Sequence, residues 1–467
     1  MPKKLRRFKI LTFGCQMNVY DSRRLSVLLT RDGWVEAGSL EEADLIFLNT
    51  CSIREKAEKK VIARLRELLP LKKANPSLIL GVGGCVAEQE GKGLIQKVSK
   101  IDLVIGPRRL HEIPALLRPL REEVFPVVLA GDPQEDPLMD SLIYPRGDDL
   151  PSPLSGFITI MEGCDNFCAY CVVPYVRGRE RSRRMEDILD EGRALIQNGA
   201  KEITLLGQNV NSYKADSLDK GVLPFPELLR RVGRLPGLKR LRFTTSHPKD
   251  FPKELSELFK TESTLAPHVH LPLQAGSDRI LKAMGRGYTM ESYLAIVDSL
   301  RAANRDISLT TDIIVGFPSE TEEDFERTLA AVKSIRFDSL FSFRYSDRPQ
   351  TRAQRLPKKV EDTVKSRRLE ELIRIQKAIS TEINQGTLGK TVEVLCDGRG
   401  RLAGQLSGRT PSNKIVHFQG EESLLGECVE VRIVRAGPVS LQGELTGPLT
   451  LMGRVSVEGE VERILVP

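Results

Sequence analysis

The stretch MEGCDNFCAYCVVPYVRGRERSRR, residues 161–184, contains three cysteines within eight residues and five arginines directly after them. The cysteines are spaced as Cys164-x3-Cys168-x2-Cys171. Thiolates are soft ligands that suit iron–sulfur clusters and zinc. A structural zinc site with four thiolates usually contains two CxxC pairs, whereas three thiolates on a four-iron cluster leave one iron open to a substrate or cofactor. A zinc knuckle or a purely structural cluster remains the alternative on spacing alone.

Residues 154–383, which contain this stretch, alternate apolar runs of strand length with helical segments. Such repeats predict a parallel barrel, here a partial (βα)6 barrel, with its chemistry at the carboxyl ends of the strands. The three cysteines follow the first strand, so we expect them at that end. The predicted strands are GFITIME, EITLLGQ, RLRFTTS, HVHLPLQ, SLTTDIIVGF and SLFSFRY.

Residues 6–122 show the same alternation and predict a separate α/β domain with a parallel sheet. Cys15, Cys51 and Cys85 each come directly after one of its predicted strands. Ligands bind outside the carboxyl ends of the strands in open parallel sheets, so three cysteines that are distant in sequence can meet there. The alternative is that each is a small buried apolar residue.

The remaining segments differ in composition. Residues 123–153 are rich in Pro, Asp and Gly and predict a linker. Residues 386–450 contain short strands separated by glycine turns and predict a small antiparallel β-barrel. Its Cys396 and Cys428 have no further soft ligands nearby and are interpreted as structural. The expected fold is an α/β multidomain chain with a parallel α/β domain, a partial barrel and a small β-barrel.

The chain of 467 residues has a net charge of +7 and 5% aromatic residues. This charge permits a polyanionic partner, and the aromatic content leaves little scope for a broad base-stacking surface. No apolar run is as long as the roughly 18 residues of a membrane span, so we expect no span, no signal peptide and a cytoplasmic location. Thiols stay reduced there, so clustered cysteines indicate metal binding or catalysis rather than disulfides.

The CxxxCxxC spacing after a first barrel strand, with Tyr170 directly before the last cysteine, resembles the radical S-adenosylmethionine enzymes. The resemblance implies that Cys164, Cys168 and Cys171 hold a 4Fe–4S cluster whose open iron binds S-adenosylmethionine. Reductive cleavage would yield methionine and a 5′-deoxyadenosyl radical. The resemblance also places Tyr170 near the adenine, while the protein positions and shields the cofactors.

Further residues of this domain are candidates for contacts with S-adenosylmethionine. Gln208 and Asn209 follow a strand and could hydrogen-bond its methionine part. Ser246 and His247 follow the next strand and could line the site, although a lone histidine is more often structural. Gly316 would allow close backbone approach near the adenine, or simply a tight turn.

The amino-terminal cysteines occur in GCQMNVYDS, LNTCSIRE and GVGGCVAEQ, which resemble the amino-terminal domain of the methylthiotransferases. The resemblance implies that Cys15, Cys51 and Cys85 hold a second 4Fe–4S cluster with an open iron or edge sulfide. It covers nearly the whole chain, because the terminal barrel resembles the TRAM RNA-binding domain. There, Arg409 and Asn413 of GRTPSNKIVHFQG are candidate RNA contacts.

The segments LLGQNVNSY, TTSHPKD and HLPLQAGSDRILKAM most resemble the branch that acts on a tRNA adenosine bearing an isopentenyl group next to the anticodon. In the implied reaction, one S-adenosylmethionine methylates a sulfur on the amino-terminal cluster. Cleavage of a second gives the radical that abstracts hydrogen from C2 of the adenine, which then receives the methylthio group. RNA readers favour such single-stranded bases. We expect a flavodoxin- or ferredoxin-type electron donor and a monomer.

The arginines after the cysteines offer rigid, bidentate contacts to phosphate. Beside a radical site they predict a surface that seats an RNA backbone, with a solvated basic loop as the alternative. These candidates are Arg177, Arg179, Arg181, Arg183 and Arg184, and Arg344, Arg348, Arg352 and Arg355 would extend the same surface.

One loop departs from the pattern of the tRNA-modifying relatives. In YSDRPQTRA, residues 345–353, Gln350 and Arg352 stand where those relatives usually have the Gly and the Pro of RPGTPA. The loop is a candidate for admitting substrate, so the departure puts its geometry in question.

Other functions remain as alternatives. The nearest are methylthiolation of threonylcarbamoyl-adenosine in tRNA and of a ribosomal-protein aspartate. A non-catalytic RNA-binding iron–sulfur or zinc protein would bind metal and RNA without cleaving S-adenosylmethionine. A plain electron-transfer ferredoxin would not explain the large second domain or the terminal barrel.

Overall fold

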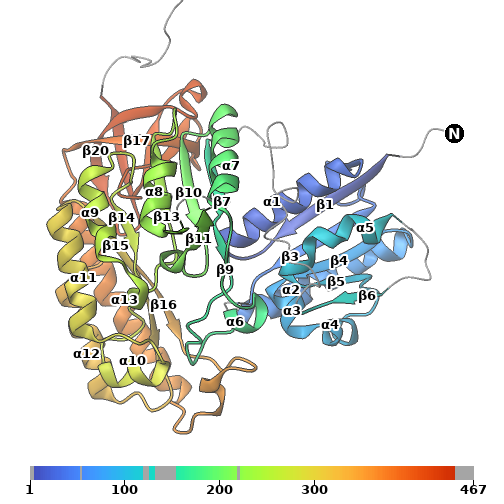
Figure 1. The fold of residues 1–467 in the computed structure, drawn as a ribbon, viewed down its shortest axis with the longest axis horizontal. Helices are drawn as coiled ribbons and strands as arrows, with labels where there is room; N and C mark the ends of the chain where they lie inside the picture. The colour runs from blue at the N-terminus through green and yellow to red at the C-terminus, as the bar shows by residue number, and fades with distance from the viewer. Residues whose placement is uncertain (1–4, 53–54, 119–125, 132–153, 218–220, 447–467) are drawn as a thin grey trace, which may run out of the picture. The chain divides into compact units, whose positions relative to one another are not determined.

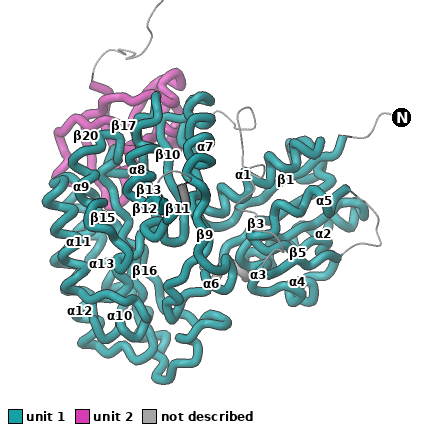
Figure 2. The backbone as a smooth tube through the Cα atoms, in the orientation of Figure 1, with its two compact units in different colours: residues 1–383, 411–413 teal, residues 384–410, 414–467 magenta. Residues whose placement is uncertain are grey.

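The computed structural model describes residues 5–52, 55–118, 126–131, 154–217 and 221–446 (Figure 1). The chain divides into two compact units. Unit 1 comprises residues 1–383 and 411–413, and unit 2 comprises residues 384–410 and 414–467 (Figure 2). In the described part of the chain, no helix is long and apolar enough to cross a membrane.

Unit 1 begins with a six-stranded sheet in the order β2-β1-β3-β4-β5-β6, in which every ladder is parallel. Both faces are buried, since Leu45 and Phe47 of β3 pack in one core and Ile46 and Leu48 in another. This explains why its long strands are continuous apolar runs. The strands are β1 (Arg6–Thr12), β2 (Trp34–Glu36), β3 (Leu45–Thr50), β4 (Ile79–Gly84), β5 (Leu103–Ile105) and β6 (Val127–Leu129). The helices are α1 (Gln16–Arg31), α2 (Glu55–Ala74), α3 (Cys85–Glu90), α4 (Lys92–Lys97) and α5 (Ile113–Leu117).

The outer strands β2 and β6 are absent from the sequence prediction. Strand β6 pairs with β5 and lies inside the segment 123–153 that was predicted as a linker. The linker prediction is wrong for residues 127–129, because they complete the sheet. Residues 132–153 of that segment lie outside the described residues.

The parallel α/β domain is followed by six strands in two parallel sheets, β13-β10-β7 and β14-β15-β16. A parallel bridge between Leu241 and Leu265 joins β13 to the segment before β14. The expected partial (βα)6 barrel is confirmed, and all six predicted strands are present. They are β7 (Ser155–Thr159), β10 (Glu202–Leu206), β13 (Arg240–Phe243), β14 (His268–His270), β15 (Ser308–Val315) and β16 (Ser339–Arg344).

Helices cover the outside of these strands and share one large hydrophobic core with them. Helix α12 shows how the sequence sets a boundary, since Thr321 accepts a hydrogen bond from Asp324 N and Asp324 Oδ2 accepts one from Thr321 N. This is a capping box. The helices are α6 (Val173–Val176), α7 (Met185–Gln197), α8 (Phe225–Gly233), α9 (Lys253–Thr261), α10 (Asp278–Met284), α11 (Met290–Ala303), α12 (Glu322–Ile335) and α13 (Asp362–Gln385). Two antiparallel pairs are β8 (Met161–Glu162) with β9 (Arg181–Ser182) and β11 (Lys214–Ser217) with β12 (Gly221–Pro224).

Unit 2 contains a closed barrel in the order β17-β18-β19-β21-β20. The expected small barrel is confirmed, although the ladder between β19 and β21 is parallel and only the others are antiparallel. Cys396 is buried in the barrel core, whereas Cys428 is exposed. The strands are β17 (Thr391–Arg399), β18 (Gln405–Arg409), β19 (Ile415–Gln419), β20 (Cys428–Ala436) and β21 (Ser440–Leu445).

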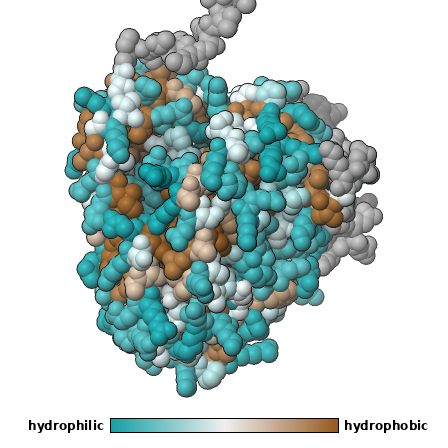
Figure 3. All heavy atoms as spheres, turned by 60° about the vertical axis from the view of Figure 1, so that its left-hand side comes forward, coloured by the Kyte–Doolittle hydropathy of each residue, from teal (hydrophilic) through white to brown (hydrophobic). Residues whose placement is uncertain are grey.

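The surface offers scattered hydrophobic positions. On the face drawn in Figure 3, hydrophilic residues cover most of the surface and hydrophobic residues lie between them. Large apolar side chains such as Val222, Phe341 and Leu402 are exposed. Some exposed apolar residues are normal on a folded protein, so the functional site is better sought where the cysteines converge.

Candidate active site

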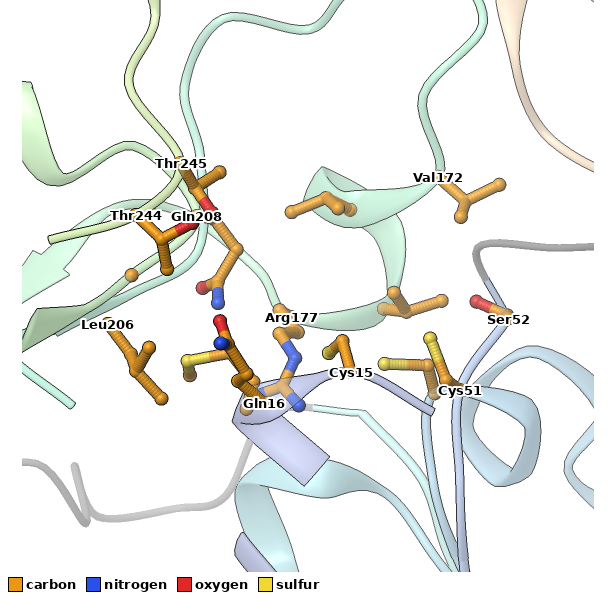
Figure 4. A pocket seen from close by; sticks show the side chains of 15 residues that line it. Cys15, Gln16, Cys51, Ser52, Val172, Arg177, Leu206, Gln208, Thr244 and Thr245 are labelled. Atoms are coloured by element: carbon orange, nitrogen blue, oxygen red, sulfur yellow. The ribbon is translucent and has the colours of Figure 1, made fainter. Parts of the chain in front are cut away.

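Three adjacent strands of the amino-terminal sheet each end next to a cysteine. Cys15 follows β1, Cys51 follows β3, and Cys85 begins α3 directly after β4. Because β3 lies between β1 and β4, the three thiols meet at one edge of the sheet. All three line one cavity of about 150 Å³ (Figure 4). The structure thus brings together the three residues that the sequence analysis grouped.

The groups around this cavity lower the pKa of the Cys15 thiol. The pKa of Cys15 is lowered to about 6, chiefly because the Cys51 side chain hydrogen-bonds to it. The positive charge of Arg177 acts in the same direction, while burial opposes both. Burial raises the pKa of Cys85. Since the thiolate is the form that binds metal, Cys15 is the ligand most readily available near neutral pH.

These residues fit an iron–sulfur cluster better than a single ion. Within the described ranges, no three His, Cys, Asp or Glu side chains gather closely enough to hold one metal ion. A cluster inserts several iron and sulfide atoms between its thiolates, so it needs thiols arranged around a cavity, as Cys15, Cys51 and Cys85 are. Soft thiolate ligands match that chemistry.

The opposite wall of this cavity comes from the central domain. Leu206 ends β10, Thr244 follows β13, and Val176 ends α6. Gln208 also lines the cavity, and its Oε1 accepts a hydrogen bond from Gly163 N at 2.6 Å. Gln208 is also a candidate contact for the methionine part of S-adenosylmethionine, and the hydrogen bond from Gly163 places it next to the second cysteine set.

The second cysteine set lies in the loop between β8 and α6. Cys171 N donates to Cys168 O at 3.0 Å, which closes a turn between these two ligands. Ala169 N donates to Met284 O at 2.7 Å, and Ala353 N donates to Ala169 O at 2.8 Å. The loop is therefore fixed by the end of α10 and by the loop that departs from the relatives' sequence.

Burial raises the pKa of two thiols in this loop. The pKa of Cys164 rises to about 11 and that of Cys171 to about 12, with the neighbouring Cys168 adding to the shift of Cys171. A metal must displace the protons of such thiols to bind them. The metal-free loop therefore holds these two thiols neutral at physiological pH.

A buried arginine that the sequence analysis missed lies beside Cys168. Arg286 Nη1 is 3.4 Å from Cys168 Sγ and 3.4 Å from the Tyr170 hydroxyl, and Nη2 donates to Pro272 O at 3.0 Å. Its side chain is buried, so its charge acts on the thiolates with little solvent screening. The only feature of the sequence that could have indicated this residue is its position in the glycine-rich stretch MGRGY after α10.

His247 also contacts this cysteine set. Its Nε2 lies 3.8 Å from Cys168 Sγ, and its Nδ1 accepts from Lys249 N at 3.2 Å. Burial, followed by the charge of Arg286, lowers the pKa of His247 to about 2. The ring is therefore neutral, lines the site and is at the same time held by a structural hydrogen bond.

Two buried polar atoms near the cysteine loop, Ser246 Oγ and Asn209 Oδ1, have no hydrogen-bond partner among the described residues. Asn209 Nδ2 donates to Asp250 Oδ2 at 2.8 Å, which also accepts from Asn166 Nδ2 at 3.2 Å. Asn166 in turn contacts Cys164 Sγ at 3.7 Å. Buried polar atoms are normally paired, so these positions fit a polar ligand such as the amino-acid part of S-adenosylmethionine.

The contacts of Gly316 favour the tight-turn interpretation. Gly316 has φ +74°, and a Cβ there would lie 2.3 Å from Lys365 Cγ. Its N–H donates to Glu320 Oε2 at 2.6 Å. Close packing and backbone conformation therefore account for this glycine.

The arginines that follow the cysteines are not all on the surface. Arg177 and Arg183 are buried and pair with Asp21 and Glu191, each at 2.7 Å. The prediction that these two contact RNA is wrong, because a buried guanidinium group cannot reach a phosphate. Two arginines of this run are therefore buried, because acidic residues from other segments pair with them, while others remain on the surface.

Arg179 and Arg184 are the exposed members of the run, with 71% and 54% of their side chains accessible. They pair with Asp165 at 3.0 Å and Asp187 at 2.9 Å, and Arg181 is half-buried. Exposed ion pairs contribute little stability. Arg179 and Arg184 therefore remain able to exchange these partners for phosphate.

The remaining predicted RNA contacts lie in other segments. Arg409 ends β18, and its Nε is 3.5 Å from Asp397 Oδ2. Asn413 has φ +66° in the turn after β18. Arg352 Nη2 donates to Phe167 O at 3.0 Å, so this arginine supports the cysteine loop.

Family models match all three regions of the chain. They are the radical SAM superfamily over residues 158–332, the uncharacterized protein family UPF0004 over residues 7–106 and the TRAM domain over residues 385–446. The tRNA-2-methylthio-N(6)-dimethylallyladenosine synthase of Geotalea uraniireducens is 47% identical, over 93% of this chain and 97% of its own length. The chain belongs to this synthase family. The synthase of Carboxydothermus hydrogenoformans is 46% identical over 94% of this chain and 99% of its own length.

Solved structures share the fold at lower identity. The radical S-adenosylmethionine methyltransferase TsrM from Kitasatospora setae, with cobalamin and a [4Fe-4S] cluster bound, has a TM-score of 0.56 and 16% identity. The match covers 86% of this chain and 80% of that one. The cobalamin-dependent S-adenosylmethionine radical enzyme OxsB has a TM-score of 0.51 and 14% identity, over 80% of this chain and 56% of that one. At this identity the likeness concerns the fold alone.

Proposed function

We propose that the chain is a radical S-adenosylmethionine methylthiotransferase, which adds a methylthio group to C2 of N6-dimethylallyl(isopentenyl)adenosine next to the anticodon of tRNA. The observation that carries the proposal is the pairing of two three-cysteine sets within one compact unit. The cavity of the first set is walled by the carboxyl ends of the barrel strands and by α6, which directly follows the second set. The family to which the chain belongs indicates which reaction this arrangement catalyses.

The cofactors of the family are two 4Fe–4S clusters and S-adenosylmethionine. We assign one cluster to Cys164, Cys168 and Cys171 and the auxiliary cluster to Cys15, Cys51 and Cys85. When bound, these groups supply the electron for cleavage of S-adenosylmethionine and the sulfur that is transferred. Arg286 would balance the negative charge of the second set, Cys164, Cys168 and Cys171, and His247, being neutral, would leave that charge unchanged.

The chain's polar residues would orient S-adenosylmethionine. Asn209 and Ser246 have unpaired oxygen atoms for its amino-acid part, and Tyr170 is assigned to the adenine side. Gln208 and Gly316 keep a supporting role, Gln208 by holding Gly163 and Gly316 by forming a tight turn. Holding substrate and cofactors in a reactive geometry is a large part of catalysis in such a site.

One short segment would set the separation of the two clusters. Cys171 belongs to one set, and six residues later Arg177 lines the cavity of the other. Helix α6 lies between them, and Val176 N in this helix donates a hydrogen bond to Val172 O at 3.1 Å. A compact turn of this kind gives the target base a fixed space between the clusters.

The RNA would be held by exposed basic and polar residues. We assign this role to Arg179 and Arg184 beside the cysteine loop and to Arg409 and Asn413 in the TRAM domain. A flavodoxin- or ferredoxin-type electron donor, a cytoplasmic location and a monomeric state complete the proposal.

The test is an anaerobic reconstitution with iron and sulfide, followed by reductant, S-adenosylmethionine and isopentenylated tRNA. The intact chain should yield 5′-deoxyadenosine and methylthiolated nucleoside by mass spectrometry. A Cys164→Ala, Cys168→Ala, Cys171→Ala variant should retain the auxiliary cluster and yield neither product. The Cys396→Ala variant is the control, because this buried cysteine lies in the barrel of unit 2.

The products also distinguish the alternatives. Deoxyadenosine without the expected nucleoside would overturn the substrate, and tRNA carrying threonylcarbamoyl-adenosine or the ribosomal protein would then be assayed in its place. Iron binding without deoxyadenosine would overturn the enzymatic proposal in favour of an RNA-binding metalloprotein.

A further inference from the structure

Arg177 is a buried cation in the wall of the amino-terminal cysteine cavity. Its side chain is buried, yet it lines the same cavity as Cys15, Cys51 and Cys85. Figure 4 shows it together with Cys15 and Cys51 among the side chains that line this cavity. Among the described residues that line this cavity, Arg177 is the only Lys, Arg, Asp or Glu and the only cation. Burying a guanidinium group is costly unless its surroundings compensate, so its position calls for an explanation.

One compensating group is Asp21 on α1. Arg177 Nη2 donates to Asp21 Oδ2 at 2.7 Å, and both side chains are almost fully buried. The pair joins the amino-terminal domain to the segment that follows the second cysteine set. An ion pair that merely fastens these two domains is therefore the simplest explanation.

Fastening alone does not explain why this pair lies at the cavity. Two other buried contacts already join α1 to the central domain, Arg24 with Glu162 at 3.6 Å and Tyr20 with Glu191 at 2.9 Å. None of these four residues lines the cavity.

Arg177 also faces the cysteines themselves. Beside the larger effects of burial and of the Cys51 contact, its positive charge lowers the pKa of both Cys85 and Cys15. A guanidinium group has five N–H donors in a fixed plane, so the contact with Asp21 leaves donors for sulfur. Arg177 is thus placed to act on whatever the three thiols hold.

We propose that Arg177 is a positioning residue that stabilises the negative charge of the iron–sulfur cluster held by Cys15, Cys51 and Cys85, by directing its N–H donors at sulfur. This inference rests on the proposed function for the presence of that cluster. Three thiolates bring three negative charges into a buried site, and hydrogen bonds to sulfur together with nearby charge set the reduction potential of such clusters.

The sign of the effect follows from the charge. Reduction adds an electron and makes the cluster more negative, so a nearby buried cation favours the reduced form. Removing the charge of Arg177 must therefore make the midpoint potential more negative. Removing the charge of Asp21, which offsets Arg177, must make it more positive.

The experiment uses the full chain carrying Cys164→Ala, Cys168→Ala and Cys171→Ala, so that only the auxiliary cluster contributes to the spectrum. The midpoint potential is measured by redox titration followed by electron paramagnetic resonance. The compared variants are Arg177→Gln, Arg177→Lys and Asp21→Asn. The matched control is Arg183→Gln, which removes another buried, acid-paired arginine that does not line the cavity.

We expect Arg177→Gln to lower the ratio of reduced to oxidised cluster at least tenfold at a fixed potential, a negative shift of about 59 mV for one electron. Arg177→Lys should give a smaller negative shift, and Asp21→Asn a positive one. Arg183→Gln should leave the potential unchanged even where it lowers stability. A purely structural ion pair would not give shifts of opposite sign for its two members.

Equal potentials in Arg177→Gln and Arg183→Gln would overturn the inference. If Arg177→Gln takes up no iron, the Asp21→Asn variant decides, and an unshifted or more negative potential there overturns it. Failure of the background chain to hold any cluster would overturn both the ligand assignment and the inference. A shifted potential without any methylthio product would uphold the inference and count against the proposed substrate alone.

Discussion

The two cysteine sets reach the same kind of site by different routes. Cys15, Cys51 and Cys85 come together only because β1, β3 and β4 are neighbours in a parallel sheet. The set from Cys164 to Cys171 lies in one loop, in which a hydrogen bond from Cys171 N to Cys168 O closes a turn. The first set therefore depends on the fold of a whole domain, and the second on the conformation of a few residues.

Because of this difference, each cysteine set should be disrupted by a different kind of substitution. The dispersed set should be lost when the sheet edge is disturbed, while the loop stays intact. The compact set should be lost when its turn is disturbed, while the sheet stays intact. Two glycines with positive φ offer a matched pair of such disturbances.

The largest effects are expected for Gly84→Ala and Gly163→Ala. Added Cβ atoms would lie 2.2 Å from Thr50 O and 2.0 Å from Arg179 O, at φ +88° and +80°. Strain and displacement of backbone should cost about 3 kcal/mol of unfolding free energy in each variant. Gly84→Ala should lose the auxiliary cluster and Gly163→Ala the other, as measured by iron content and Mössbauer spectroscopy.

Gly91→Ala is the control for both, since its φ is +50° and its Cβ would meet no atom within 4 Å. It should retain both clusters. If Gly84→Ala and Gly163→Ala lost the same cluster, the two sets would not be independent.

The next effect concerns the thiols of the metal-free chain. Cys15, with its pKa lowered to about 6, is mostly thiolate at pH 7, whereas Cys164, with its pKa near 11, is mostly protonated. Allowing for the lower intrinsic reactivity of a more acidic thiol, alkylation of Cys15 should be roughly a hundredfold faster at pH 7. Iodoacetamide labelling with peptide mass spectrometry measures both rates.

The two thiols should also differ in how their alkylation rates depend on pH. The rate at Cys15 should rise through about pH 6 and then level off, while the rate at Cys164 should continue to rise above pH 9 because burial raises its pKa to about 11. A common pH profile for both thiols would contradict the electrostatic difference between the two sets.

A smaller effect is expected for Arg286→Met, which removes the cation beside Cys168. The variant loses the contact with Cys168 and the hydrogen bond to Pro272 O. We expect a loss of about 2 kcal/mol in unfolding free energy and weaker retention of the cluster at the second set only. Chelator challenge of the reconstituted chain measures the retention. Arg279→Met, at an exposed arginine, is the control, and equal loss from both sets would contradict the prediction.

The smallest effect concerns the loop that departs from the relatives. Gln350 has φ +68°, a conformation that glycine adopts without strain. Gln350→Gly should therefore raise the unfolding free energy by about 0.5–1 kcal/mol, measured by denaturant titration. Gln354→Gly, at a nearby exposed position without positive φ, should lower it or leave it unchanged. A decrease for Gln350→Gly would show that its side chain contributes more than the strain removes.

Much of this arrangement could be predicted from the sequence. The six barrel strands and strands β1, β3, β4 and β5 of the amino-terminal sheet lie in apolar runs of strand length, which the sequence shows directly. The convergence of Cys15, Cys51 and Cys85 follows from the rule that parallel strands end at a common edge. The edge strands β2 and β6 were missed for other reasons, since WVE of β2 has only two apolar residues and VVL of β6 lies in a segment whose Pro, Asp and Gly content predicted a linker.

The errors that concern the arginines share one physical cause. Arg177 and Arg183 belong to a run of charges that resembles a surface, but Asp21 and Glu191 approach them through the tertiary fold and allow burial. Arg286 was missed for the same reason, because its contact with Cys168 joins residues 118 positions apart. A local sequence pattern can identify metal ligands that are close in sequence. Ion pairs between residues that are distant in sequence can be identified only in the folded structure.

The most direct test of the account is the number of clusters in three reconstituted chains, measured by Mössbauer spectroscopy and iron analysis. The chains are the intact protein, the Cys15→Ala, Cys51→Ala, Cys85→Ala variant and the Cys164→Ala, Cys168→Ala, Cys171→Ala variant. The account predicts two 4Fe–4S clusters in the intact chain and one in each variant. A variant that keeps both clusters, or loses both while remaining folded, would contradict the claim that the two cysteine sets form separate cluster sites.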